Sequence, residues 1–474
     1  MSYQTIVGLE IHVELSTKTK AFCSCANEFG GEPNTRVCPT CLGLPGGLPV
    51  LNKNVVNYSV MAGLALNCHI AKKSKFDRKN YFYPDLTKGF QITQDDMAIC
   101  SEGYLEIEGE EGLKKVGIFK VQMEEDTGKS LHTEDNETLM DYNRCGVPLI
   151  EIVSKPDMNS GKEARLFLEK LKSTLKYIGV SDVKMEEGSL RCDVNVNVID
   201  KTTNKKTQVT EVKNINSFRG AEKAIDFEVN RHIELLKNGE DEVKTTRRWD
   251  DVNNQTVLMR EKYTVADYRF APEGDLLEVV LTDEWINDIK DKLPELPEEK
   301  KKRFIKDYKL PEYDAEVLTS SQQLADYYEE VAKRFDDTAM ISNWIMTEIL
   351  RRVENVEESF DLPFTPEDLV ELLQTIKDGK INNNAGKKVL REMFETGKKP
   401  MAIIEEQGLI QISDTSEIET IVETILSENA QSIEDYKAGK DRAFGFLVGQ
   451  VMKASRGKAN PQVVNELLKK KLNS

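Results

Sequence analysis

Four cysteines give the clearest chemical signal in the sequence. One residue separates Cys23 from Cys25 and two separate Cys38 from Cys41, with twelve residues between the pairs. Two close cysteine pairs joined by a short loop can place four thiolates around one tetrahedral zinc ion. Because four sulfur ligands leave no open coordination position, the spacing predicts a structural zinc site in loop 23–41. Four unrelated reduced thiols are the alternative, which this spacing disfavours.

An alternating run near the N-terminus is the second signal. From Val7 to Leu15 every odd-numbered residue is apolar, a pattern that predicts a β-strand. Successive strand side chains point to opposite faces, so Glu10, His12 and Glu14 should share one face. A solvated sheet face would show the same alternation, and for a single strand that interpretation is the better one.

Acidic and polar residues recur in other predicted strands, which shifts the balance. Residues 191–197 alternate polar with apolar side chains, 149–153 enclose one carboxylate in an apolar run, and 123–126 contain three adjacent acids. A carboxylate buried without a partner is costly. Several carboxylates that converge on a sheet would suit Mg²⁺ carrying nucleotide phosphates. That these side chains meet in space is a hypothesis at this point.

One apparent nucleotide motif fails on inspection. Thr127–Ser130 reads TGKS, like the end of a phosphate-binding P-loop. That loop needs a glycine five residues before Gly128, and Met123 stands there. Any ATP chemistry must therefore use another scaffold.

Residues 75–86, KFDRKNYFYPDL, place cations beside aromatic rings. Such a segment could bind phosphates and stack a nucleoside base. An aromatic-rich strand with a basic flank is an equally good interpretation from composition alone.

Charge is unevenly distributed along the 474 residues. The formal net charge of −17 argues against a general nucleic-acid coat, which would be basic throughout. Residues 431–474 nevertheless carry nine Lys or Arg and four Asp or Glu, a local balance of +5. This basic tail predicts one localised contact with a phosphate backbone. A lysine-rich, solvated helix end is an even alternative on charge alone.

The expected location is the cytoplasm, with no membrane segment. The N-terminal residues lack a charged-then-apolar leader, and no apolar run approaches the roughly 18 residues of a membrane helix. The eight cysteines are accordingly interpreted as thiols or metal ligands, not as disulfides.

The elements that must hold these residues fall into three parts. Up to about residue 290, short alternating runs are interrupted by helical patterns at 162–178 and 221–237, which predicts a large mixed α+β domain, 1–292. The proline-punctuated, charged stretch 292–303 marks a boundary. Beyond it the spacing is helical, with a turn-prone region near residue 408, which predicts domains at 293–407 and 408–474.

Many ordered blocks of the chain resemble one known family. They include VGLEIHVEL, KFDRKNYFYPDLTKGFQITQ, DYNRCGVPLIEIVSKPD, MEEGSLRCDVNVNV, EVKNINSF and the terminal DYKAGKDRAFGFLVGQVMKASRGKANPQVVNELL. Together they closely resemble the B subunits of the bacterial and organellar aspartyl/glutamyl-tRNA amidotransferases, over nearly the whole chain. The resemblance implies a cradle domain with an antiparallel-rich sheet, then an all-helical domain, then a small helical tail that touches tRNA.

The resemblance also implies a reaction and partners. The B subunit would use ATP and Mg²⁺ to phosphorylate the side-chain carboxylate of Glu on glutamine tRNA or of Asp on asparagine tRNA. Ammonia from a partner glutaminase, the A subunit, would then attack the acyl phosphate, with a small C subunit completing a heterotrimer. A carboxylate-held Mg²⁺ with nearby Lys and Arg is sufficient for such a transfer.

The implied site residues follow from the matching blocks. The cation cluster would comprise Glu10, His12, Glu124, Glu125 and Glu151, with Glu10, His12, Glu125 and Glu151 as magnesium ligands. Arg78, Lys79 and Arg191 would neutralise phosphates, Asp193 and Asn195 would position substrate or metal, and Arg78, Lys79, Tyr81 and Lys129 would contact ATP. The expected tRNA contacts are Lys437, Lys440, Arg442, Lys453, Arg456 and Lys458.

Two other classes compete with this interpretation. A non-enzymatic, zinc-containing RNA-binding module would explain the tail but would give the carboxylates no task. A glutaminase or free-standing ligase would need a Ser-Ser-Lys constellation, which no spacing in the sequence supports. Ammonia is therefore expected from a partner.

Overall fold

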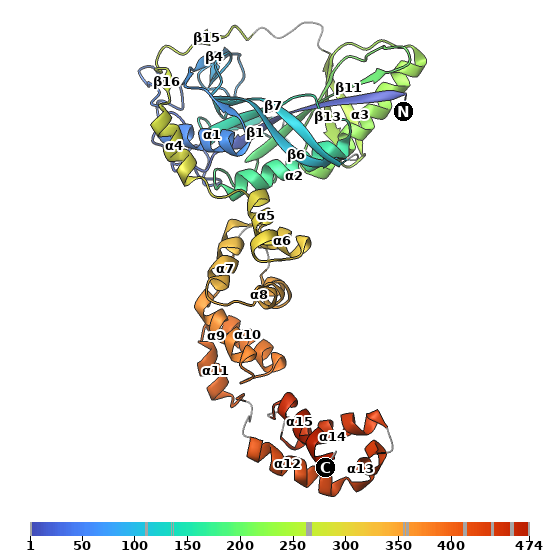
Figure 1. Ribbon diagram of the computed structural model, residues 1–474. Coiled ribbons are helices and arrows are strands. Elements are labelled where there is room, and N and C mark those ends of the chain that lie inside the picture. The colour runs from blue at the N-terminus through green and yellow to red at the C-terminus, as the bar shows by residue number, and fades with distance from the viewer. Residues whose placement is uncertain are drawn as a thin grey trace. The chain divides into compact units, whose positions relative to one another are not determined.

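The computed structural model describes residues 2–109, 112–133, 135, 137–261, 268–353, 356, 360–410, 415–437, 440–455 and 459–472. The chain divides into two compact units, Met1–Leu296 and Pro297–Ser474 (Figure 1). Each unit has its own hydrophobic core and is described separately.

A nine-stranded sheet forms the frame of the first unit, in the order β14-β13-β12-β11-β1-β10-β7-β6-β2. Its neighbours pair antiparallel, except β12 with β13, which are parallel. The strands are β1 (Tyr3–Glu14), β2 (His69–Ile70), β6 (Cys100–Gly109), β7 (Gly112–Glu125), β10 (Pro148–Ser154), β11 (Leu190–Asp200), β12 (Thr210–Lys213), β13 (Thr245–Asp250) and β14 (Gln255–Glu261). The long strand β1 therefore lies in the interior of the sheet, between β11 and β10.

Smaller sheets surround this frame. One has the order β15-β4-β5, the second pairs β16 with β3, and the third is the hairpin β8–β9. Their bounds are β3 (Lys73–Ser74), β4 (Asp77–Asn80), β5 (Phe90–Thr93), β8 (Lys129–His132), β9 (Thr138–Asp141), β15 (Ala271–Pro272) and β16 (Val279–Val280). Strand β5 lies against β7, which brings the segment around residues 77–93 to the main sheet.

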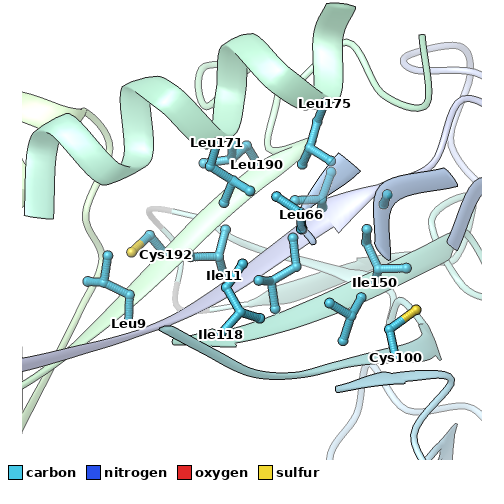
Figure 2. Packing of buried hydrophobic residues seen from close by; sticks show 14 of the residues in the cluster. Leu9, Ile11, Leu66, Cys100, Ile118, Ile150, Leu171, Leu175, Leu190 and Cys192 are labelled. Carbon is cyan, nitrogen blue, oxygen red and sulfur yellow. The ribbon is translucent and has the colours of Figure 1, made fainter. Parts of the chain in front are cut away.

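One face of the main sheet is apolar and covered by helices. Helices α2 (Gly161–Tyr177) and α3 (Phe218–Asn238) pack against each other and against β6 and β11 respectively. Figure 2 shows Leu171 and Leu175 of α2 directed at Leu9 and Ile11 of β1, all of them buried. Helices α1 (Lys53–Ala65) and α4 (Asp283–Lys292) complete the unit.

Local signals explain where the two covering helices begin and end. The hydroxyls of Ser160 and Ser217 each accept a backbone N–H of the first turn and so cap the helix N-termini. Helix α3 ends at Gly239, which has φ 71°, a left-handed conformation that glycine adopts without strain. Both helices coincide closely with the helical patterns predicted from the sequence.

The second unit is helical throughout its described residues. The first group comprises α5 (Pro297–Asp307), α6 (Glu312–Leu318), α7 (Gln322–Ala332), α8 (Thr338–Trp344), a π-helical turn (Ile345–Ile349), a 3-10 turn (Leu350–Arg352), α9 (Pro366–Lys377), α10 (Asn383–Thr396) and α11 (Pro400–Glu406). A separate core holds α12 (Thr415–Glu428), α13 (Ala430–Lys437), α14 (Asp441–Ala454) and α15 (Pro461–Leu472).

The predicted fold class is confirmed: a mixed unit with a large antiparallel-rich sheet precedes a helical region. The predicted division at residues 292 and 407 stays a prediction. Among the described helices, none combines the length and apolar character that a membrane span requires.

Candidate functional site

The face of β1 opposite the helices carries the polar side chains. Val7, Leu9, Ile11 and Val13 are fully buried beneath α2 and α3, whereas His12 on the other face is half-buried. The predicted alternation of this strand is therefore confirmed. Because β1 has a partner on each side, its polar side chains meet those of both neighbours.

Register aligns a polar row across four strands. His12 of β1 pairs with Arg191 of β11 on one side and with Glu151 of β10 on the other. Glu151 in turn pairs with Gln122 of β7. Directly paired residues on one face of a sheet have side chains in contact range. The convergence that the sequence left as a hypothesis is thus a consequence of strand order.

The first group of ligand atoms belongs to His12, Glu124 and Glu151, and these atoms lie within 4.8 Å of one another. His12 Nε2 is 3.8 Å from Glu124 Oε2. The Gln122 amide donates to Glu124 Oε1 at 2.7 Å and also to Glu151, while Thr93 of β5 donates to Glu124 at 2.6 Å. Two carboxylates and an imidazole held this closely form a seat for a divalent cation.

Burial controls the protonation of this group. It lowers the pKa of His12, so the imidazole is neutral and has a lone pair for a metal at neutral pH. Burial and the nearby charge of Glu124 raise the pKa of Glu151 well above its usual range. Burial also works to raise the pKa of Glu124, but the attraction of His12 and Lys79 outweighs it and lowers that pKa. A cation would remove the repulsion between the two carboxylates.

A second group lies on the same face, toward β12. Ligand atoms of Glu10, Asp193 and Glu211 lie within 4.8 Å of one another. Asn195 donates to Glu10 Oε1 at 3.0 Å. Lys213 forms ion pairs with Asp193 and, at 3.4 Å, with Glu211. This group is three carboxylates with one ammonium, which also suits a hard cation.

The sequence interpretation missed Glu211 and Lys213. Both alternate with buried residues in β12, so the period-two pattern that singled out β1 could have found them. A strand of four residues gives only two polar positions, too few to distinguish from chance. Their place depends on the pairing of Asn195 with Glu211 across β11 and β12, which a single sequence does not reveal.

Glu125 lies apart from both groups. Its carboxylate pairs with Lys88 and accepts the Ile92 backbone N–H at 3.0 Å. Adjacent residues of a strand point to opposite faces, so Glu124 and Glu125 cannot both face β1. The structure brings Glu124 to His12 and Glu151, in the place expected for Glu125.

Lys79 and Tyr81 form an aromatic and cationic flank beside the first group. Lys79 Nζ lies 4.9 Å from the centre of the Tyr268 ring and 6.0 Å from that of Tyr81. Its positive charge contributes to the lowered pKa of Glu124. These contacts leave the ammonium beside the carboxylates, where phosphate oxygens would need it.

The other two expected nucleotide contacts are placed differently. Arg78 donates two hydrogen bonds to Glu273, at 2.7 and 2.8 Å, and one to Asp275 at 3.2 Å. Its guanidinium is therefore neutralised within the protein and is not directed at the carboxylate groups. Lys129 is exposed on the hairpin strand β8.

Arg191 closes the other end of the polar row. Its Nη2 donates to Asp126 at 2.5 Å, and Arg144 Nε lies 3.6 Å from the same oxygen. Burial and Asp126 raise the pKa of Glu14 to about 8. Among the described residues, Arg191 Nε is buried without a hydrogen-bond partner, and so is Gln122 Oε1. A buried donor and a buried acceptor without partners fit an anion and a cation respectively.

The four cysteines of loop 23–41 come together as predicted. Their sulfurs lie within 4.8 Å of one another, and all four are free thiols. A hydrogen bond with Cys23, the Cys38 backbone N–H and the charge of Lys20 lower the pKa of Cys41 to about 4. These four residues could hold a metal ion.

The expected tRNA contacts lie in the last helices. Three of them, Lys437, Arg442 and Lys453, are exposed. Lys440 pairs with Asp435 at 2.9 Å. Arg456 and Lys458 lie outside the described residues.

Comparisons with known proteins agree with this arrangement. The family described as the GatB/GatE catalytic domain matches residues 5–287, and the GatB domain matches residues 326–472. Over 475 aligned residues the chain is 54% identical to the B subunit of the aspartyl/glutamyl-tRNA(Asn/Gln) amidotransferase of Clostridium tetani, covering 100% of this chain and 99% of that protein. It is 53% identical to the first of the numbered B subunits of Clostridium acetobutylicum and 52% identical to the B subunit of Thermoanaerobacter pseudethanolicus, with both chains covered completely.

The chain belongs to the family of aspartyl/glutamyl-tRNA(Asn/Gln) amidotransferase B subunits. The family inferred from the sequence is thereby confirmed. An enzyme whose relatives are named as B subunits is an amidotransferase of several subunits.

Proposed function

We propose that this chain carries out the ATP-dependent step of a tRNA-dependent amidotransferase. It phosphorylates the side-chain carboxylate of Glu on glutamine tRNA, or of Asp on asparagine tRNA, and the resulting acyl phosphate is then amidated to Gln or Asn. The observation that carries the proposal is the polar face of β1, where two groups of cation ligands lie beside Lys79 and Arg191.

Charge explains why this equipment suits the reaction. A carboxylate is a poor acyl donor, and transfer of the γ-phosphoryl group from ATP converts it to an acyl phosphate with a good leaving group. Ammonia attacks the acyl carbon and inorganic phosphate leaves. The barrier to such transfers is lowered mainly by positioning and by neutralising phosphate charge. Lys79 and the unpartnered Nε of Arg191 can bind the anionic oxygens.

Cation ligands come from both groups on this face. His12, Glu124 and Glu151 would hold one Mg²⁺, and Glu10, Asp193 and Glu211 a second. When bound, Mg²⁺ supplies neutralisation of the nucleotide phosphates. Gln122 and Asn195 hold the carboxylates of the two groups in place through hydrogen bonds. Tyr81, next to Lys79, offers a ring for the nucleoside base.

The other assigned segments have supporting roles. Loop 23–41 holds a structural zinc ion through its four cysteines. The exposed cations of α13 and α14 contact the tRNA backbone, as the domain prediction of a separate tail, 408–474, requires. An A subunit supplies ammonia by hydrolysing glutamine, and a small C subunit completes a heterotrimer in the cytoplasm.

An assay of the complex tests the proposal. The chain is purified with its A and C partners and given ATP, Mg²⁺, glutamine or ammonium, and either Glu-tRNA(Gln) or Asp-tRNA(Asn). We expect ATP-dependent formation of Gln-tRNA or Asn-tRNA with either nitrogen donor. Binding of tRNA without ATP consumption would support a non-enzymatic RNA-binding module and would overturn the proposal.

A further inference from the structure

Lys20 is an unusual residue because its side chain is completely buried, with an exposed fraction of 0%. It stands just after β1 and ahead of the cysteine loop. Removing an ammonium from water costs several kcal/mol unless a counter-charge and hydrogen bonds compensate. The phosphorylation reaction gives Lys20 no task, so its burial requires another explanation.

The partners of the ammonium are a carbonyl and a sulfur. Lys20 Nζ donates to the Arg36 carbonyl at 2.7 Å and to Cys41 Sγ at 3.7 Å. Within the described residues, no carboxylate forms an ion pair with Lys20. A carbonyl carries only a partial charge, so the Cys41 sulfur is the group that can balance a full positive charge.

The cysteine loop also directs a second donor to the same sulfur. The Cys38 backbone N–H lies 3.1 Å from Cys41 Sγ. Four thiolates around a divalent metal leave an excess of two negative charges. In a partly buried centre that excess is unfavourable, and one ammonium beside a ligand sulfur halves it.

We propose that Lys20 is the buried counter-cation of the cysteine centre and stabilises its metal-thiolate state. A disulfide would make the sulfurs neutral and leave the ammonium buried without a counter-charge, so Lys20 disfavours oxidation of the pair. The inference rests on the proposed zinc assignment. Lys20 is a positioning residue here, because it acts on the metal through Cys41.

Packing alone is the competing explanation for Lys20. A Cβ placed on Gly146 would lie 3.7 Å from Lys20 Cδ and 3.5 Å from Cys41 Cβ, so the aliphatic part of Lys20 helps fill this region. Methionine has a similar length and no charge. Lys20→Met therefore keeps the packing and removes the counter-charge, which separates the two explanations.

Zinc affinity is the direct test. Full-length wild type, Lys20→Met and Lys18→Met are compared by zinc competition with a chromophoric chelator, after circular dichroism has verified folding. Lys18 is an exposed neighbour and serves as the matched control. We expect Lys20→Met to weaken zinc binding at least about tenfold, the scale of lost outer-shell partners. We expect no change for Lys18→Met.

The outcomes separate the two assignments. Equal zinc affinity for wild type and Lys20→Met would overturn the role of Lys20 and leave the zinc site intact. A wild type that binds no zinc would overturn both.

A double variant keeps the test valid if Lys20→Met folds poorly. In metal-free protein, Cys41→Ser deprives the ammonium of its counter-charge. Adding Lys20→Met to Cys41→Ser should then raise the thermal midpoint relative to Cys41→Ser alone. A further fall of the midpoint by the amount that Lys20→Met causes in wild type would contradict the proposal.

Discussion

The cysteine centre and the polar face of β1 both gather metal-ligand side chains, but they are built in different ways. The cysteine centre uses four soft ligands from nineteen consecutive residues, 23–41, and is closed by a buried ammonium. The polar face uses hard oxygen ligands and one imidazole from four strands, β1, β7, β10 and β11, with Glu211 from a fifth, β12. The first arrangement suits a structural ion and the second suits ions that carry a substrate.

The largest expected effect comes from the polar face. Glu124→Gln removes a charged ligand from the group with His12 and Glu151. We expect the rate of ATP-dependent amidation to fall by about 10³, the scale for loss of one charge-stabilising group. Binding of tRNA should persist, because the tail is unaltered. The matched control is Glu108→Gln, an exposed position on β6; amidation at the wild-type rate in Glu124→Gln would contradict the assignment.

Acid should loosen the polar face before it affects the cysteine centre. Burial alone would raise the pKa of Glu228 in α3, but hydrogen bonds from His232 and Arg231 outweigh burial and lower it to about 2. Arg231 also donates to Thr210 in β12, at 3.0 Å. A carboxyl pKa that is lower in the folded state stabilises the fold above the unfolded value near 4.5, and this contribution is lost as pH falls toward 2.

The size of this contribution is at most about 3 kcal/mol. We expect the stability of wild type to drop between pH 6 and pH 3 more than that of Glu228→Gln, as measured by urea unfolding followed by circular dichroism. Identical pH dependence in the two proteins would show that Glu228 does not link acidity to the position of β12.

These two regions also differ in how far a sequence reveals them. The spacing of Cys23, Cys25, Cys38 and Cys41 is local, so a short loop determines it and the prediction holds geometrically. The alternation in β1 was equally readable, since period two follows from the strand itself. The fold class and the positions of α2 and α3 were predictable for the same reason, from periodicity and capping residues.

What the sequence left open depends on pairing between distant strands. Glu124 and Glu125 are adjacent, and only the direction of β7 decides which of them faces His12. Arg78 carries the charge expected of a phosphate ligand, but Glu273, far away in the chain, binds it. Such contacts are set by tertiary structure, and a single sequence holds no direct record of them.

The basic tail should give a smaller, salt-dependent effect. A triple variant, Lys437→Ala with Arg442→Ala and Lys453→Ala, removes three exposed cations. We expect tRNA affinity to fall about tenfold or more, and the slope of log affinity against log salt to become shallower by about 0.7–0.9 per lost phosphate contact. Glutamine hydrolysis by the complex is the control and should not change. An unaltered salt slope would remove these residues from the tRNA interface.

The smallest effect on the reaction is expected from the cysteine centre. Wild type should contain about one zinc ion per chain, and Cys38→Ser should lose it. Because the centre lies outside both carboxylate groups, the amidation rate should fall far less than in Glu124→Gln. Elemental analysis and the amidation assay on the same preparation check both statements. Zinc-free wild type would refute the site.

Transfer of the γ-phosphoryl group tests the central assignment most directly. The complex is incubated with γ-labelled ATP and Glu-tRNA(Gln), without glutamine or ammonium, and label in the aminoacyl-tRNA fraction and release of ADP are measured. The wild type and Cys38→Ser should both transfer label in a tRNA-dependent manner, and Glu10→Ala should transfer none. Undiminished transfer by Glu10→Ala would contradict the polar face of β1 as the phosphorylation site.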